Sequence, residues 1–275
     1  RTRQFASAIA DAGHDVVVLR LTATSRAPMP LRRPGRSAGG NPIEERTAPG
    51  EVFARGEGRE VLRGLEADAV VAATVHASSL VARAVADDVP LWVDVFGDPM
   101  AEAQAKAVVD GHDLALARYW GALILALDRG DRFSAVSRAQ AHALIGQLGL
   151  AGRLTAASAG NDMVTVIPCG AERLETPAEA RALDGEVPQE AFLVAFNGSF
   201  NTWCDVETML TGVEAAMDTE ARIHMVVTGG AVPGHDERTY EEFLERVRAS
   251  RHSTRFQVLG WVDRTRLEEL YSRAD

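Results

Sequence analysis

The chain has 275 residues, enough for one large domain or two of ordinary size. Its 46% hydrophobic and 25% charged residues are typical of globular proteins, and no run of about 18 apolar residues predicts a membrane-spanning helix. The formal net charge of −10 argues against a broad basic face, so no nucleic-acid partner is expected. The two cysteines, Cys169 and Cys204, lack metal-ligand spacing, which predicts neither a disulfide framework nor a metal site and fits a reducing cytoplasm.

Apolar runs alternate with helical stretches over the first two thirds of the chain. A helix around Phe5 and Ile9, closed by Gly13, is expected before the first strand. Residues 22–57 are predicted to be a loop. The predicted strands are 16–19, 69–72, 91–95, 133–136 and 164–167. The predicted helices between them are 58–66, 76–86, 99–129 with a break near Gly111, and 138–148.

The same rhythm restarts after residues 172–190, where charge, proline and alanine dominate, as in a linker with one short helix. The predicted strands of this last part are 192–196, 223–227 and 256–259, and the predicted helices are 205–217, 236–249 and 264–273. Near-continuous apolar strands separated by helices are typical of parallel sheets covered on both faces. We therefore predict an α/β fold of two doubly wound units, with residues 1–175 in the first, 176–190 as linker and 191–275 in the second.

Both ends of the sequence fall inside the predicted pattern. Residue 1 lies within a helical stretch, and the last predicted helix ends where another strand would follow. We therefore expect the chain to be a fragment of a longer protein, truncated at both termini.

The basic residues from Arg26 to Arg36 form the one basic concentration, in a segment rich in proline, glycine, serine and alanine. This composition predicts a mobile loop, because it buries little apolar surface. The alternative is contact with an anionic lipid or polymer, so peripheral membrane contact stays open.

The stretch from 192 to 205 combines a short apolar strand with a predicted turn at Asn197-Gly198-Ser199 and a helix that begins at Asp205. A glycine-containing turn before a helix N-terminus points backbone N–H groups outward and can bind an anion such as a phosphate. Trp203 either stacks on a base or sugar or fills the seam between helix and sheet. Gly229, with the glycine after it, is predicted to end a strand near the ligand or to form a plain turn.

Four segments occur in an order and spacing found in a known group of enzymes. They are Ala-Gly-His-Asp-Val at 12–16, Phe-Ser-Ala-Val-Ser at 133–137, Val-Thr-Val-Ile-Pro-Cys-Gly-Ala-Glu at 164–172, and Phe-Gln-Val-Leu-Gly-Trp-Val at 256–262 with the following helix that ends Leu-Tyr-Ser-Arg-Ala-Asp. With these segments the chain resembles the GT-B glycosyltransferases, in particular the retaining enzymes that use nucleotide-sugar donors.

The resemblance implies two Rossmann-like domains, with the acceptor on the N-terminal domain and the nucleoside-diphosphate sugar on the C-terminal one. It implies transfer of a sugar, of the hexosyltransferase type, to a glycan or other hydroxyl acceptor, with retention and without a metal or cofactor. Relatives often carry Arg and Lys after the glycine turn, and this chain carries neither there. A diphosphate would then depend on Gly198 and other backbone N–H groups, the hydroxyls of Ser199 and Thr202, and the amide of Asn201.

Acceptor-side candidates follow the predicted strands of the first unit, because ligands of such sheets bind at the carboxyl ends of strands. Asp94 and Asp98 could bind acceptor hydroxyls or steady positive charge on the sugar, and Asp98 could instead cap the helix that begins at Pro99. His76 begins a helix after a strand and could face the acceptor or lie on the surface. Glu102 is more typical of a first-turn acid than of a ligand.

Two other functions stay open at this point. A sugar-nucleotide epimerase can share the two-domain fold but would need acid–base groups around the donor, and the second half of the chain shows few. A non-catalytic sugar-nucleotide or glycan binder is favoured by the missing Arg and Lys. A nicotinamide-dependent dehydrogenase is disfavoured, because no G-x-G-x-x-G follows a predicted strand.

Overall fold

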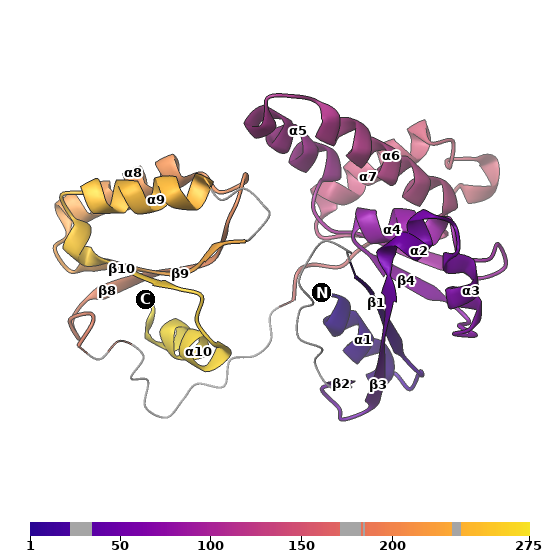
Figure 1. Cartoon of the computed structure of the whole chain (residues 1–275), viewed down its shortest axis with the longest axis horizontal. Coiled ribbons are helices and arrows are strands. Elements are labelled where there is room, and N and C mark those ends of the chain that lie inside the picture. The colour runs from indigo at the N-terminus through magenta and orange to yellow at the C-terminus, as the bar shows by residue number, and fades with distance from the viewer. Residues whose placement is uncertain (23–34, 171–182, 184, 233–237) are drawn as a thin grey trace. The chain divides into compact units, whose positions relative to one another are not determined.

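The computed structural model describes residues 1–22, 35–170, 183, 185–232 and 238–275. The chain divides into two compact units, Arg1–Ala171 and Glu172–Asp275, which we call unit 1 and unit 2 (Figure 1). In the described part of the chain, no helix is long and apolar enough to span a membrane.

Unit 1 contains two sheets. The strands of the first are β1 (Val17–Thr22), β2 (Gly35–Arg36) and β3 (Pro42–Pro49), in the order β1-β3-β2, with β1 and β3 parallel. The strands of the second are β4 (Val70–Ala73), β5 (Leu91–Val95), β6 (Arg132–Ala135) and β7 (Val164–Val166), which are all parallel and adjacent in chain order. All four carboxyl ends of the second sheet therefore lie along one edge.

The helices of unit 1 are α1 (Thr2–Asp11), α2 (Gly50–Ala54), α3 (Gly58–Arg63), α4 (Val75–Ala82), α5 (Pro99–Asp110), α6 (Leu114–Arg129) and α7 (Arg138–Leu150), with a short 3₁₀ turn at Ala156–Ser158. The main core packs β5 and β6 against α4, α6 and α7, with Leu91, Val93, Leu127, Phe133 and Leu144 all buried. Because β5 carries apolar side chains on nearly every position, it is covered on both faces.

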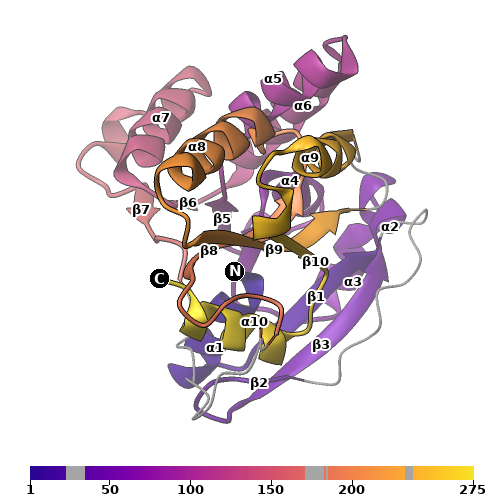
Figure 2. The same ribbon diagram turned by 90° about the vertical axis from the view of Figure 1, so that its left-hand side faces the viewer.

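Unit 2 is a three-stranded parallel sheet of β8 (Phe192–Phe200), β9 (Ile223–Ala231) and β10 (Phe256–Gly260), ordered β10-β9-β8. Its helices are α8 (Val206–Thr219), α9 (Arg238–Ala249) and α10 (Arg264–Arg273), with a 3₁₀ turn at Ser253–Arg255. The helices α8 and α9 cover one face of the sheet and α10 covers the other (Figures 1 and 2). Successive parallel strands connected in one direction place their connecting helices on the same face.

The alternating α/β pattern with parallel sheets is confirmed, and three local predictions were wrong. Within the predicted loop 22–57, the structure forms β3 and α2. Three consecutive charged residues from Glu44 to Arg46 hide the strand pattern, in which only Ile43 and Ala48 are buried. The basic segment lies mostly outside the described residues, with Arg36 described and bonded through Nη1 to the carbonyl of Gly40 at 2.7 Å.

The predicted turn at Asn197-Gly198-Ser199 is also wrong, because β8 continues through it to Phe200. Gly198 pairs with Gly229, which likewise lies inside β9 and not at its end. Asparagine, glycine and serine disfavour strands in isolation. Pairing with β9 and complete burial of the Phe200 side chain override that preference here.

About half of the predicted linker 176–190 lies outside the described residues. Its described part includes Leu183 and Val187, which are buried in a core with Leu193, Val226 and Leu270 of unit 2. The predicted domain boundaries stay a prediction.

Candidate functional site

The carboxyl ends of β4 and β5 bring the three predicted acceptor-side residues to one edge of unit 1. Ala73 and Asp94 are paired in the register of these strands. His76 is exposed in the first turn of α4, Asp94 lies within β5, and Asp98 is the exposed N-cap residue of α5. Their roles toward a substrate stay predictions.

The Asp94 carboxylate is fully buried and bonded to Arg1. Arg1 Nε lies 2.6 Å from Oδ2, Arg1 Nη2 lies 2.8 Å from Oδ1, and the Ser134 hydroxyl also donates to Oδ1. The same guanidinium donates to the carbonyls of Ile167 at 2.9 Å and Pro168 at 3.2 Å. Hydrogen bonding to Asp94 raises the pKa of Arg1. Both carboxylate oxygens are thus committed, so Asp94 can act on a substrate only through Arg1.

Asp98 caps α5, because its Oδ1 accepts the N–H groups of Met100 at 3.1 Å and Ala101 at 3.2 Å. Burial raises the pKa of Glu102, one turn further on, and the charge of Asp98 adds to that effect. Burial, with the Glu102 charge second, also raises the pKa of Tyr119 on α6. Glu102 therefore holds its proton more strongly than a solvated glutamate does, a property common among proton-transferring groups.

Glycines bring the backbones of β8 and β9 together at the carboxyl end of unit 2. Gly229 has φ +95°, and a Cβ there would overlap the carbonyl oxygen of Gly198. Next to this contact, the Thr228 hydroxyl donates to Asn197 Oδ1 at 3.0 Å. Close to the carboxyl ends of both strands, this glycine pair therefore presents backbone and no side chains.

The other predicted donor-side residues lie at the end of β8 and in the loop that connects it to α8. Asn201 Nδ2 donates to the Ser199 hydroxyl at 3.4 Å, and Asn201 Oδ1 accepts the N–H of Trp203 at 3.2 Å. Thr202 is half-buried, and the Trp203 side chain is 51% exposed. The structure therefore brings Gly198, Ser199, Asn201, Trp203 and Gly229 into one region. The contacts formed there are between protein groups, and donor binding stays a prediction.

The charge near this loop is negative. No Lys or Arg occurs from residue 192 to 221. Asp205 accepts the Thr208 N–H at 2.9 Å as the cap of α8, which lowers the pKa of Asp205. The partial positive charge at the N-terminus of α8 is thus already next to the Asp205 carboxylate.

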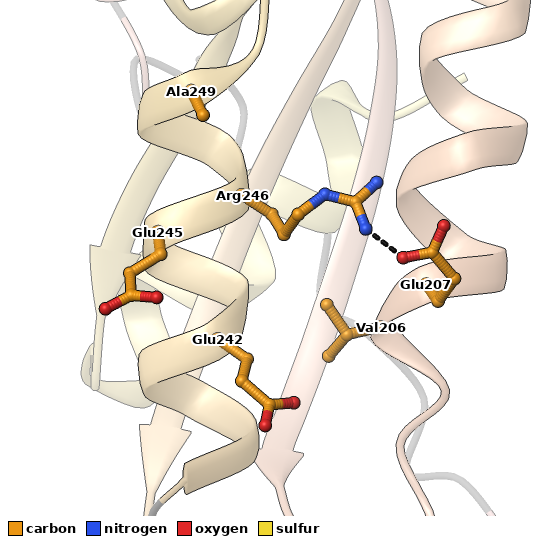
Figure 3. Close-up of a pocket in the computed structure, with 6 residues that line it drawn as sticks. All are labelled: Val206, Glu207, Glu242, Glu245, Arg246 and Ala249. Carbon is orange, nitrogen blue, oxygen red and sulfur yellow. Dashed lines mark hydrogen bonds and ion pairs between the residues drawn. The ribbon is translucent and has the colours of Figure 1, made fainter.

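A hollow of about 410 Å³ lies between α8 and α9 (Figure 3). It is lined by Val206, Glu207, Glu242, Glu245, Arg246 and Ala249, and Arg246 reaches from α9 to pair with Glu207 on α8. Three carboxylates against one paired guanidinium make this hollow unsuitable for a diphosphate. Among the described residues, no group of three His, Cys, Asp or Glu side chains is placed to hold a metal ion.

Arg1 and Trp261 were missed by the sequence analysis, whereas Phe96 lies within the predicted stretch from Asp94 to Asp98. Arg1 bonds to Asp94, and the Phe96 side chain after β5 is 45% exposed. Trp261 after β10 is 65% exposed, and its Nε1 donates to the carbonyl of Ala231 at 3.3 Å. The available signal for Trp261 was an aromatic residue directly after an apolar strand, whereas nothing local in the sequence links Arg1 to a residue 93 positions away.

The parallel sheets and the arrangement of strand ends define a GT-B glycosyltransferase fold. Residues 1–172 match the sequence profile of Glycosyltransferase Family 4, and the chain belongs to that family. Comparison with curated proteins gave no match.

Solved structures share the fold at low sequence identity. HepE of Anabaena, in complex with UDP and glucose, has a TM-score of 0.59 and 18% identity over 86% of this chain and 60% of that chain. HepE in complex with UDP-glucose has a TM-score of 0.59 and 16% sequence identity, and the match covers 94% of this chain and 72% of that chain. A ugt transferase from Siraitia grosvenorii, in complex with UDP, has a TM-score of 0.50 and 13% sequence identity, and the match covers 96% of this chain and 69% of that chain. The chain thus spans about 60% of the length of the first of these HepE chains.

Proposed function

We propose that the protein transfers a sugar, of the hexosyl type, from a nucleoside-diphosphate sugar to a hydroxyl acceptor such as a glycan, with retention. Membership of Glycosyltransferase Family 4 and the GT-B fold support this activity. The observation that carries it is the carboxyl edge of the unit 2 sheet, where Gly198 and Gly229 pair close to the strand ends and α8 begins soon after β8. Such an edge lets backbone N–H groups approach a diphosphate.

On the donor side, the Ser199 and Thr202 hydroxyls, the Asn201 amide and the backbone at Gly198 and Gly229 would hold the diphosphate. Trp203 would lie against the base or the sugar. During transfer, the bond from the anomeric carbon to the diphosphate oxygen breaks and its electron pair stays on the diphosphate. The acceptor oxygen bonds to that carbon, and its proton passes to the leaving diphosphate. No metal or other cofactor is expected in this scheme.

On the acceptor side, Asp98 and His76 would face the acceptor hydroxyl in unit 1. Asp94 would contribute by holding Arg1, because its carboxylate is buried and already bonded. Glu102, a half-buried acid close to Asp98, supplies a second group that can exchange a proton.

Nucleotide titration of purified protein tests the donor site. Binding of UDP-, GDP-, ADP- and dTDP-sugars is measured by calorimetry for the wild type and for Asn201→Ala, which we expect to weaken affinity about 2- to 10-fold by removing one hydrogen-bonding group. Asn161→Ala in unit 1 is the matched control, since its amide is exposed and bonds only to the Ala157 carbonyl among described residues. Equal affinity of both variants, or no binding at millimolar concentration, contradicts the proposal.

A second candidate function, non-catalytic binding of a sugar nucleotide or glycan, is favoured by one observation. The stretch from Asn197 to Asp205, which includes the end of β8 and the loop before α8, carries a carboxylate and no basic side chain. Asp205→Asn, which keeps a capping oxygen and removes the charge, should tighten nucleotide binding several-fold at low salt. If the wild type transfers radiolabelled sugar to any acceptor, the transferase function is supported. If it binds the nucleotide sugar without transfer, the non-catalytic binding function is supported.

A further inference from the structure

His252 lies between two charged groups at the amino end of the unit 2 sheet. It directly precedes the 3₁₀ turn Ser253–Arg255 that leads into β10, and its side chain is only 13% exposed. The ring atom Nε2 lies 2.7 Å from Oδ1 of Asp218 on α8, and Nδ1 lies 2.5 Å from Nη2 of Arg255. The ring therefore connects the end of α8 to the segment before β10.

These two contacts define which nitrogen of the His252 ring carries the proton. An ionised carboxylate only accepts hydrogen bonds, so Nε2 is protonated and donates to Asp218. A guanidinium only donates and keeps its charge, so Nδ1 is bare and accepts from Arg255. Hydrogen bonding from His252 lowers the pKa of Asp218, and the charge of Arg251, which pairs with Asp218, adds to that effect. Asp218 therefore stays ionised in mild acid, and the contacts fit a neutral ring.

Arg255 holds the C-terminal end of α8. Its Nη2 donates to the carbonyl of Met217 at 2.9 Å, and its Nη1 donates to the carbonyls of Glu220 at 3.1 Å and Ala221 at 3.4 Å. The last carbonyls of a helix have no partner within the helix, and a basic side chain can satisfy them in this way. Because the same Nη2 bonds both His252 and Met217, the position of the guanidinium depends on the bare Nδ1 of the ring.

Charged and titratable groups from several elements lie around His252 and Arg255. They are Asp218 on α8, Glu220 and Arg222 after it, His224 on β9, Glu190 before β8, and Arg251 on the same segment as His252. Hydrogen bonding from Arg222 lowers the pKa of Glu220 to about 2, so this acid also stays ionised. Nδ1 of His224 is buried without a hydrogen-bond partner among the described residues, and burial, with the charge of Arg255 second, lowers the pKa of His224. Of these groups, the two histidines can change charge between about pH 5 and 8.

We propose that His252 is an acid-sensitive latch, which as a neutral ring holds Arg255 on the last carbonyls of α8 and as an imidazolium releases it, so that the end of α8 loosens. A proton taken from solvent at Nδ1 removes the acceptor for Nη2 and places a second cation at contact distance from the guanidinium. The bond from Nε2 to Asp218 remains. The latch lies at the amino ends of β9 and β10, whereas the proposed donor site lies at the carboxyl ends, so it does not depend on the proposed transfer reaction.

An NMR titration of the 275-residue chain from about pH 8 to about pH 5 tests the latch. The ring nitrogens of His252 should show the Nε2–H tautomer at the neutral end and the protonated ring at the acid end. Over the same interval, exchange protection of the amides of residues 216–220, corrected for the intrinsic effect of pH, should fall about tenfold relative to the middle of α8. His252→Gln, whose amide can donate to Asp218 and accept from Arg255 without titrating, should keep that protection constant. His142→Gln, at an exposed histidine of α7 in unit 1, is the matched control and should show the wild-type fall.

Two further variants test the latch even if His252→Gln does not fold. Asp218→Asn keeps an accepting oxygen and removes the carboxylate that stabilises the imidazolium, so the loss of protection should move to lower pH. His224→Leu removes the other histidine near Arg255 and should leave the loss in place. A His252 ring that stays neutral down to about pH 5 overturns the proposal. So does a loss of protection that persists in His252→Gln, disappears in His224→Leu, or keeps its pH in Asp218→Asn.

Discussion

Gly229 shows how one residue without a side chain shapes the donor-side edge. Its φ of +95° and the overlap of any Cβ with the Gly198 carbonyl leave room for glycine only. Gly229→Ala should lower the free energy of unfolding of unit 2 by roughly 2–4 kcal/mol, through strain and a forced separation of β8 from β9. Urea unfolding followed by tryptophan fluorescence measures this.

Gly212→Ala is the matched control for that change. Gly212 lies exposed inside α8, and a Cβ there meets nothing within 4 Å. This variant should stabilise the protein by roughly 0.5–1 kcal/mol, because alanine is the better helix former. Similar effects of the two substitutions would contradict the close contact between the strands.

Glu102 gives a prediction with a definite sign in pH. Burial raises its pKa in the folded state above the ordinary 4.5, so ionisation at neutral pH costs stability. The favourable effect of the protonated form is complete below pH 4.5 and is lost as pH rises through the folded pKa. Glu102→Gln should therefore raise the melting temperature at pH 7 to 8, and the gain should vanish near pH 4. A gain that is independent of pH would argue that ionisation of Glu102 carries no cost.

At the scale of single elements, α10 depends on its N-cap. Asp263 Oδ1 accepts the N–H of Arg266 at 2.9 Å, and α10 buries Leu270 against the sheet. Asp263→Ala should cost about 1 kcal/mol of stability, while Asp263→Asn, which keeps the accepting oxygen, should cost a few tenths at most. Thermal unfolding of the two variants measures this, and an equal loss in both would assign the effect to charge and not to capping.

The sequence pattern was sufficient for elements whose local preference agrees with their packing. The helix 264–273 and the strand 91–95 were predicted with the bounds that the structure has, because apolar periodicity and caps coincide there. The last residues of β8 and β9 could not be found in this way. Asn197, Gly198 and Gly229 join the sheet only through pairing between strands that are some thirty residues apart in the chain.

The candidate site was predictable in location but not in contacts. The rule that ligands bind at the carboxyl ends of parallel strands led to Asp94, Asp98 and Asn201. Both carboxylate oxygens of Asp94 are bonded to Arg1 because the start of α1 lies close to β5. No local sequence pattern predicts that contact.

At the scale of the whole molecule, the two units differ in the chemical groups that they present near their strand ends. After β5, unit 1 presents the exposed Phe96 ring and the capping residue Asp98, and unit 2 presents a glycine pair close to the ends of β8 and β9 and the capped helix α8. A nucleotide that binds only the folded protein should stabilise it by about 2.7 kcal/mol at a concentration 100 times its Kd. The proposed donor site places this nucleotide binding in unit 2.

Hydrogen–deuterium exchange of the 275-residue chain, with and without each nucleotide sugar, tests the central claim most directly. The account predicts that one nucleotide series slows exchange at residues 198–206 and at the ends of β9 and β10, and leaves the α8–α9 hollow around Glu242 and Arg246 unchanged. Protection confined to that hollow, or no protection with any nucleotide sugar at millimolar concentration, would contradict a donor site at the strand ends of unit 2.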